Sequence, residues 1–277
     1  SHKSLDEEMM NGTKEFFHRT IEVNGEIVSF IDGGSGPTLL LMHGIAGNSR
    51  SWREQFEGLT SEYRLIAWDA PGYGKSALRN GTLADYVSTA TGLLAALNVE
   101  RVNILGHSMG GVIAQGIAGS ELVKVDKLIL SSTFTGHGEP LGKPLQAGYI
   151  SRLNDIARMP PEEFGKARAK SMLACPPSEE IFKEVAEIAS RVKRSGLFSA
   201  CEVLTYSNTS EFLKGFTKPV LIITGRHDRI VLPKRSTDMA AHIADVQHIQ
   251  FEKSGHAAYL EEPLAYNLTI KKFLSCR

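Results

Sequence analysis

VNILGHSMGGVIA, residues 102–114, is an apolar run that breaks at one serine between two glycines and then resumes with small residues. This pattern is typical of a strand, a tight turn and a helix. In a G-x-S-x-G turn the serine adopts a strained backbone, so Gly106 and Gly110 relieve the crowding and leave its hydroxyl exposed. Ser108 is therefore a candidate nucleophile. The same five residues also fit a glycine-rich turn whose serine only caps a helix.

Two further polar segments follow apolar runs later in the chain. The run 219–225 ends shortly before Asp228, and the run 247–252 ends shortly before His256. Because open α/β sheets place reactive groups at the carboxyl ends of their strands, we expect both side chains to lie near Ser108. A serine hydroxyl needs a base near neutral pH, and the base needs a third group to fix its tautomer. The sequence therefore predicts a triad of Ser108, His256 and Asp228.

These segments resemble the α/β-hydrolase family, in which the nucleophile, the acid and the histidine follow in the same order along the chain. In that family a His-Gly pair after the third strand shapes the oxyanion loop, and this chain has His43 and Gly44 there. The resemblance implies that the backbone N–H groups of Ile45 and Met109 form the oxyanion hole. The segment DAPGYGKS, residues 69–76, is similar to a turn that is common in the family.

Two alternatives to the predicted acid and base come from neighbouring positions. Some members of the family carry the acid at the end of an earlier strand, the one predicted here at 125–132. This chain has Ser131 and Ser132 at that place. Asp228 is therefore the predicted acid. His227 stands beside it as a rival base, but no acidic residue follows His227 at a strand end.

The other apolar runs predict one large sheet. Residues 19–31 alternate on both sides of Asn24-Gly25 and predict a hairpin, and the wholly apolar run 38–42 predicts a strand covered on both faces. With the run before Ser108, further strands are predicted at 63–69, 125–132, 219–225 and 247–252. Helices are predicted over 83–97 and after Pro263. The eight strands match the mostly parallel sheet flanked by helices that the resemblance implies.

The segment 136–218 contains no predicted strand, although a crossover between neighbouring parallel strands needs far fewer residues. Its apolar residues instead share one helical face around 145–156 and another around 182–192. We therefore expect residues 1–135 and 219–277 to form an α/β core and residues 136–218 to form a helical insertion. The resemblance identifies the insertion as a cap over the active site, and a helical satellite away from the site is the alternative.

Composition excludes several classes of function. The 277 residues are 42% hydrophobic and contain 31 Lys+Arg and 31 Asp+Glu, so nothing predicts a nucleic-acid partner. The three cysteines are far apart and have no metal-type spacing, which indicates free thiols in a reducing compartment. No stretch approaches the ~20 apolar residues that span a bilayer, and the polar start lacks a signal-peptide core. We expect a cytoplasmic protein with a small-molecule substrate, no membrane partner, no metal and no cofactor.

The resemblance also implies a reaction, the cleavage of small carboxylic esters or lactones through an acyl-serine. Haloalkane dehalogenases and epoxide hydrolases have an aspartate at the nucleophile position. The segment 255–263 looks like that of carboxylesterases and enol-lactonases of aromatic degradation. Carbon–carbon hydrolases of the same pathways usually have a tryptophan after the histidine and Gly-Pro-Gly in the oxyanion loop, where this chain has Ala257 and residues 45–47, Ile-Ala-Gly. A carbon–carbon hydrolase, a ligand receptor and a cofactor-independent oxygenase are the open alternatives.

The substrate pocket is predicted from the residues that adjoin the oxyanion loop and the nucleophile. We expect it to be lined by His43, Asn48, Trp52 and His107. His43 is also expected to act as a structural hydrogen-bonding group, because it precedes the tight turn at Gly44.

Overall fold

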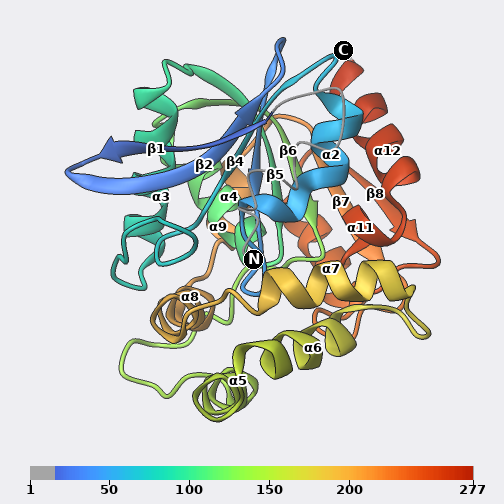
Figure 1. Ribbon diagram of the computed structural model, residues 1–277. Coiled ribbons are helices and arrows are strands. Elements are labelled where there is room, and N and C mark those ends of the chain that lie inside the picture. The colour runs from blue at the N-terminus through green and yellow to red at the C-terminus, as the bar shows by residue number, and fades with distance from the viewer. Residues whose placement is uncertain (1–15, 277) are drawn as a thin grey trace.

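The computed structural model describes residues 16–276, which fold around one eight-stranded sheet (Figure 1). The strand order is β1-β2-β4-β3-β5-β6-β7-β8. The pairs β1/β2 and β2/β4 are antiparallel, and the other neighbouring pairs are parallel. The strands are β1 (Phe17–Val23), β2 (Glu26–Gly33), β3 (Thr38–Met42), β4 (Arg64–Trp68), β5 (Arg101–His107), β6 (Lys124–Ser131), β7 (Val220–Gly225) and β8 (Val246–Phe251). The predicted mostly parallel, eight-stranded α/β sheet is confirmed.

The hairpin and the buried strand both form where the sequence predicts them. Asn24 and Gly25 join β1 to β2 with φ of 52° and 80°, as a two-residue turn between twisted strands requires. In β3, Leu40 packs into one hydrophobic cluster and Leu41 into another, and both are fully buried. Alternate side chains of a central strand therefore enter separate cores on the two faces of the sheet.

Helices cover both faces of the sheet, with α3 on the left and α12 on the right in Figure 1. One face of the sheet packs against α3, α4, η2 and α9 (Ser210–Gly215), and the opposite face packs against α2, α11 and α12. The helices of this core are η1 (Ser49–Trp52), α2 (Arg53–Leu59), α3 (Leu83–Ala96), α4 (Met109–Ser120), α10 (Pro233–Thr237), η2 (Asp238–His242), α11 (Ala258–Glu261) and α12 (Pro263–Ser275). Pro263 is the first residue of α12, as predicted.

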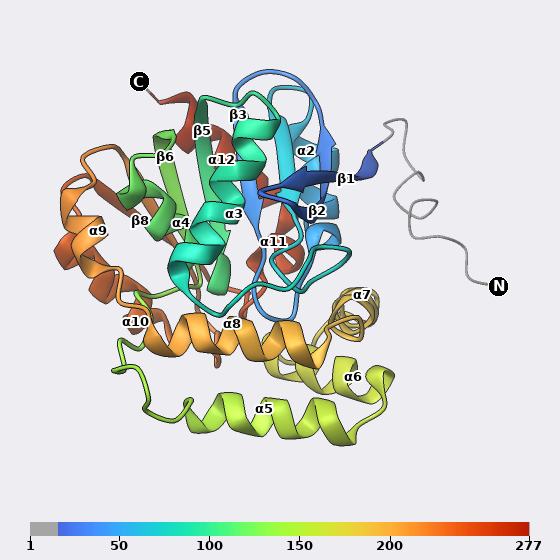
Figure 2. The same ribbon diagram turned by 90° about the vertical axis from the view of Figure 1, so that its left-hand side faces the viewer.

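The chain between β6 and β7 forms five helices and no strand among its residues, all of which the structure describes. They are α5 (Ala147–Arg158), α6 (Pro161–Met172), α7 (Glu179–Ala189), α8 (Arg194–Tyr206) and α9 (Ser210–Gly215). Helices α5 to α8 gather at one end of the sheet, at the bottom of both Figure 1 and Figure 2. The Arg53 guanidinium fixes α7 to the core through two 2.9 Å hydrogen bonds to Glu184. Ile150, which was expected on the buried face, is 42% exposed.

Two sequence-based expectations concern the environment of the protein. Cys175, Cys201 and Cys276 are free thiols, as their spacing predicts. Over residues 16–276, no helix combines the length and the apolar character that crossing a membrane requires. The polar start of the chain, on which the expected location partly rests, lies outside the described residues.

Candidate active site

Ser108 stands at the sharp turn between β5 and α4, with φ of 53° and ψ of −116°. A Cβ atom on Gly106 would lie 2.4 Å from the Gly110 carbonyl oxygen, and one on Gly110 would lie 2.0 Å from the Met42 carbonyl oxygen. Both positions therefore have room for glycine alone. The strand, turn and helix that the sequence predicts are present, and the serine takes the strained backbone that such a turn imposes.

Asp228 follows β7 and His256 follows β8, and their side chains are hydrogen-bonded to each other. The His256 Nδ1 atom lies 2.8 Å from Asp228 Oδ2, and both side chains are almost fully buried. The other oxygen, Asp228 Oδ1, accepts hydrogen bonds from the amides of Ile230 and Val231 at 2.9 and 3.1 Å. Burial acts to raise the pKa of Asp228, but the charge of His256 and these hydrogen bonds lower that pKa overall. The ionised carboxylate accepts a hydrogen bond from His256 Nδ1–H, which leaves His256 Nε2 unprotonated and able to act as a base.

Ser108 and His256 line the same pocket. The loop after β3 contributes Gly44 and Ile45, and helices α5 and α6 contribute Arg152, Arg168 and Met172. The pocket therefore lies between the carboxyl ends of the parallel strands and the helices inserted after β6. Asp228 is not among its lining residues and contacts it through His256.

The loop after β3 runs directly beside the serine. A Cβ atom on Gly44 would lie 3.1 Å from Ser108 Cβ. Within residues 16–276, the amides of Ile45 and Met109 donate to no protein acceptor. Met109 is the first residue of α4, where backbone N–H groups have no partner inside the helix. These two amides are available to an anionic oxygen near Ser108.

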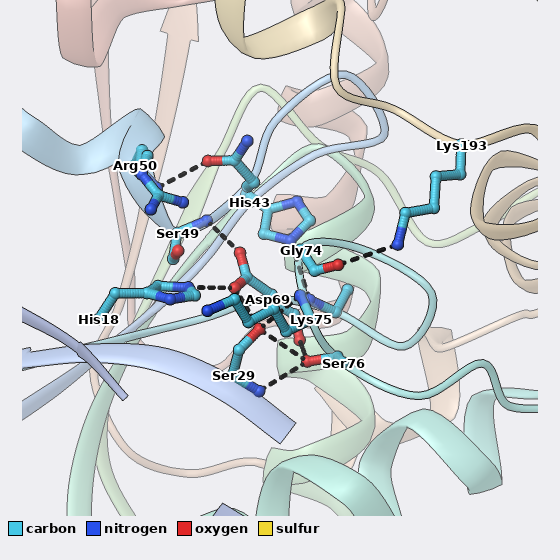
Figure 3. Close-up of polar contacts among 12 residues, drawn as sticks. His18, Ser29, His43, Ser49, Arg50, Asp69, Gly74, Lys75, Ser76 and Lys193 are labelled. Carbon is cyan, nitrogen blue, oxygen red and sulfur yellow. Dashed lines mark hydrogen bonds and ion pairs between the residues drawn. The ribbon is translucent and has the colours of Figure 1, made fainter. Parts of the chain in front are cut away.

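A buried polar network around Asp69 is bonded to the loop after β3 (Figure 3). Asp69 Oδ2 lies 2.9 Å from His18 Nε2 and accepts from the Ser29 hydroxyl, while Oδ1 accepts from the Ser49 amide at 2.8 Å. His43 Nε2 accepts from the Ala70 amide at 3.0 Å, so its Nδ1 donates to the Gly44 carbonyl. The DAPGYGKS turn and His43 therefore hold the loop that carries Ile45.

The expected substrate-pocket residues have different outcomes. His107 lines the pocket, whereas His43, Asn48 and Trp52 are absent from its walls. Asn48 caps η1, and its side chain accepts a hydrogen bond from the Arg50 amide. The Trp52 indole is fully buried and packs on Tyr259, with ring centroids 4.9 Å apart. The polar side chains of His43 and Asn48 are thus bonded to backbone groups, and the role of these three residues toward a substrate stays a prediction.

Sequence reasoning missed two groups that fix the His256 loop. His107 Nε2 donates to the His256 carbonyl at 2.6 Å, which makes His107 more than a wall residue. The Glu261 carboxylate accepts from the amides of Gly255 and Ala257, each at 3.0 Å, on either side of His256. The sequence gives no capping signal for this contact, because Glu261 is four residues after Ala257 and a capping box places its glutamate three residues after the cap.

We predict that His107 makes the protein labile to mild acid. Burial, then the charge of His256, lowers the pKa of His107 to about 3, against about 6.5 in an unfolded chain. As pH falls, His107 is therefore protonated at a higher pH in the unfolded state than in the folded state. The stability contributed by neutral His107 is complete above pH 6.5 and is lost as pH falls toward 3, by about 2 kcal/mol at pH 5.

Urea unfolding at pH 7.5 and pH 5.0 measures this loss of stability. The matched variant is His107→Gln, which keeps a side-chain N–H donor but cannot titrate. Its free energy of unfolding should fall by about 2 kcal/mol less than that of the wild type between the two pH values. The same fall in both proteins would show that His107 does not carry the effect.

Comparison with known proteins adds a family and several named relatives. The sequence model described as the alpha/beta hydrolase family matches residues 39–267. The chain is 29% identical over 268 residues to the 2-hydroxy-6-oxononadienedioate/2-hydroxy-6-oxononatrienedioate hydrolase of Cupriavidus pinatubonensis, covering 87% of this chain and 88% of that protein. It is 26% identical over 248 residues to the pimeloyl-(acyl-carrier protein) methyl ester esterase of Vibrio campbellii, covering 87% and 95% respectively.

Solved structures share the same arrangement of elements. The enol-lactonase from Burkholderia xenovorans LB400 aligns with a TM-score of 0.83 at 20% identity, over 93% of this chain and all of that one. At this identity the alignment shows a shared fold.

Proposed function

Because the chain belongs to the alpha/beta hydrolase family, we propose that it is a serine hydrolase of small carboxylic esters or lactones. Ser108 is the proposed nucleophile, His256 the general base and Asp228 the residue that orients His256. The observation that carries the proposal is the 2.8 Å hydrogen bond from His256 to Asp228. His256 also lines one pocket with Ser108, which stands at a strained turn.

The proposed reaction starts with attack of Ser108 Oγ on the acyl carbon, while His256 Nε2 accepts the hydroxyl proton. The resulting oxyanion is held by the amides of Ile45 and Met109, each expected to contribute about 10²–10³ in kcat. His256 then gives the proton to the leaving alkoxide oxygen. Water, deprotonated by the same nitrogen, attacks the acyl carbon and releases the carboxylic acid and the free serine. Asp228 stabilises the imidazolium that forms in both halves.

We also propose that residues 136–218 act as the cap over this site. The support is that α5 and α6 each contribute side chains to the pocket of Ser108, and that the His256 amide donates to the Met172 carbonyl at 2.7 Å. A helical satellite away from the site would make neither contact. The residues of the cap that reach the pocket would then select the substrate.

A second candidate reaction is carbon–carbon bond hydrolysis. The relative from Cupriavidus pinatubonensis is named for a substrate, 2-hydroxy-6-oxononadienedioate, that contains no ester. Its hydrolysis therefore breaks a carbon–carbon bond. The same serine, histidine and aspartate would serve that reaction, so the test below includes a substrate of this type.

We predict multiple turnover of small esters. A p-nitrophenyl ester of a short acid should release many equivalents of nitrophenol per protein chain at a steady rate, because water regenerates the free serine. The same protein is to be assayed with an enol-lactone, with a 2-hydroxy-6-oxo-dienoate and for oxygen uptake with a heteroaromatic compound. One stoichiometric burst followed by no turnover would favour a ligand receptor, and oxygen uptake would favour an oxygenase.

A further inference from the structure

Two arginines reach the pocket, and the proposed reaction uses neither of them. Arg152 comes from α5 and Arg168 from α6, and both line the pocket together with Ser108 and His256. Among the described residues that line this pocket there is no aspartate, glutamate or lysine. The wall supplied by α5 and α6 therefore carries positive charge that no lining carboxylate balances.

The Arg168 guanidinium has an unused hydrogen-bond donor. Its Nε atom is buried and has no hydrogen-bond partner within the described chain. Burial, then repulsion from Arg152, lowers the pKa of Arg168 to about 9. A charged donor that is buried and unpaired destabilises the folded protein. A bound ligand that accepts its hydrogen bond would remove this cost.

Neighbouring acids do not pair with the two pocket arginines. Asp155, which lies close enough to raise the pKa of Arg168, is bound to Arg158 at 2.7 Å. Arg152 forms no ion pair with any acid in residues 16–276, and its guanidinium carbon lies 5.7 Å from the centre of the Tyr149 ring. Other arginines between β6 and β7, such as Arg158 and Arg191, do have carboxylate partners.

We infer that Arg152 and Arg168 bind a carboxylate of the substrate, at a position away from the bond that is cleaved. The inference rests on the proposed function and names its substrate class, esters or lactones that carry a second, ionised carboxyl group. Guanidinium groups match carboxylates in geometry and form short, charge-assisted hydrogen bonds. A substrate carboxylate would satisfy the free Arg168 donor and reduce the repulsion between the two cations.

The test compares charged and neutral esters of equal length. Half-methyl esters of glutarate and adipate place the carboxylate on the acyl side, 4-acetoxybutyrate places it on the alcohol side, and each is paired with an analogue whose carboxylate is a methyl group. The wild type should show a kcat/KM ratio of charged to neutral ester of about 10 to 100 in at least one pair. Arg168→Gln and Arg152→Gln should each reduce that ratio about tenfold or more, and Arg168→Lys less than Arg168→Gln.

Lys166→Gln provides the matched control, because Lys166 is an exposed cation on α6 two residues from Arg168. It removes the same unit of charge and should leave the ratio within about twofold of wild type. A general defect in folding or in the catalytic residues would lower both rates and leave the ratio unchanged. Equal rates for charged and neutral esters in the wild type, or a ratio unaffected by both arginine substitutions, would overturn the inference while the proposed function stands.

A binding measurement keeps the inference testable without turnover. Titration calorimetry of wild type with glutarate and adipate should give a Kd at least about tenfold lower than for Arg168→Gln. If no ester is hydrolysed but this difference is present, the proposed function fails and the carboxylate site is supported. If wild type and Arg168→Gln bind both dicarboxylates equally or not at all, the inference fails.

Discussion

Replacing Ser108 with alanine is expected to lower kcat for ester hydrolysis by about 10⁴ to 10⁶. The substitution removes the proposed nucleophile, and without it His256 and the oxyanion amides can assist only direct attack by water. The backbone is expected to stay in place. The Ser108 amide donates to the Ser131 carbonyl at 3.0 Å, and the Ser108 carbonyl accepts from the Thr133 hydroxyl at 2.6 Å, and neither bond uses the Ser108 side chain.

Ser108→Gly is the companion variant to Ser108→Ala. Glycine tolerates the positive φ of residue 108 that strains a residue with a Cβ atom. We expect Ser108→Gly to be as inactive as Ser108→Ala but to melt at a higher temperature. Thermal unfolding and steady-state rates of the three proteins measure both effects. Activity of Ser108→Ala within tenfold of wild type would exclude Ser108 as the nucleophile.

Asp228→Asn is expected to lower kcat by about 10⁴ while the protein remains folded. Asp228 Oδ1 accepts two backbone amides, so the oxygen of an asparagine would take that place and its NH₂ group would face His256. His256 Nδ1 would then have to accept a hydrogen bond, and its proton would move to Nε2. A protonated Nε2 cannot take the serine proton. Steady-state rates with a p-nitrophenyl ester measure the loss.

His227→Gln is the control for Asp228→Asn. His227 is exposed next to Asp228 in the sequence and is the rival base that the motif leaves open. Its replacement should change kcat by less than about twofold, because His256 and not His227 is bonded to Asp228. A large loss in His227→Gln together with near-normal activity in Asp228→Asn would contradict both the choice of His256 over His227 as the base and the orienting role of Asp228.

The parts of the fold that the sequence predicts well are those specified by nearby residues. Asn24-Gly25 can form only a narrow set of turns, and so fixes the hairpin of β1 and β2. The elbow at Ser108 is equally local, because glycines two residues on either side of the serine are required by contacts within the turn and with β3. The pairing of Asp228 with His256 follows from strand ends that a parallel sheet brings together.

The contents of the pocket depend on contacts between distant elements and could not be predicted in the same way. The periodicity of residues 145–156 identifies α5 as an amphipathic helix, but it does not show that Arg152 of α5 and Arg168 of α6 turn toward the ends of β3 and β5. Ile150 is exposed despite its apolar side chain, and Trp52 enters the core instead of the pocket. Their positions are set by how the inserted helices and α11 pack on the sheet.

Labelling with a p-nitrophenyl alkylphosphonate tests the role of Ser108 most directly. The phosphorus atom takes the place of the acyl carbon, so attack by the nucleophile expels nitrophenol and leaves a stable bond between phosphorus and oxygen. We predict one adduct per chain in the intact mass, located by peptide mapping at Ser108, and none in Ser108→Ala. An adduct on another residue, or an unlabelled wild-type protein that still hydrolyses esters, would contradict an acyl-serine at this position.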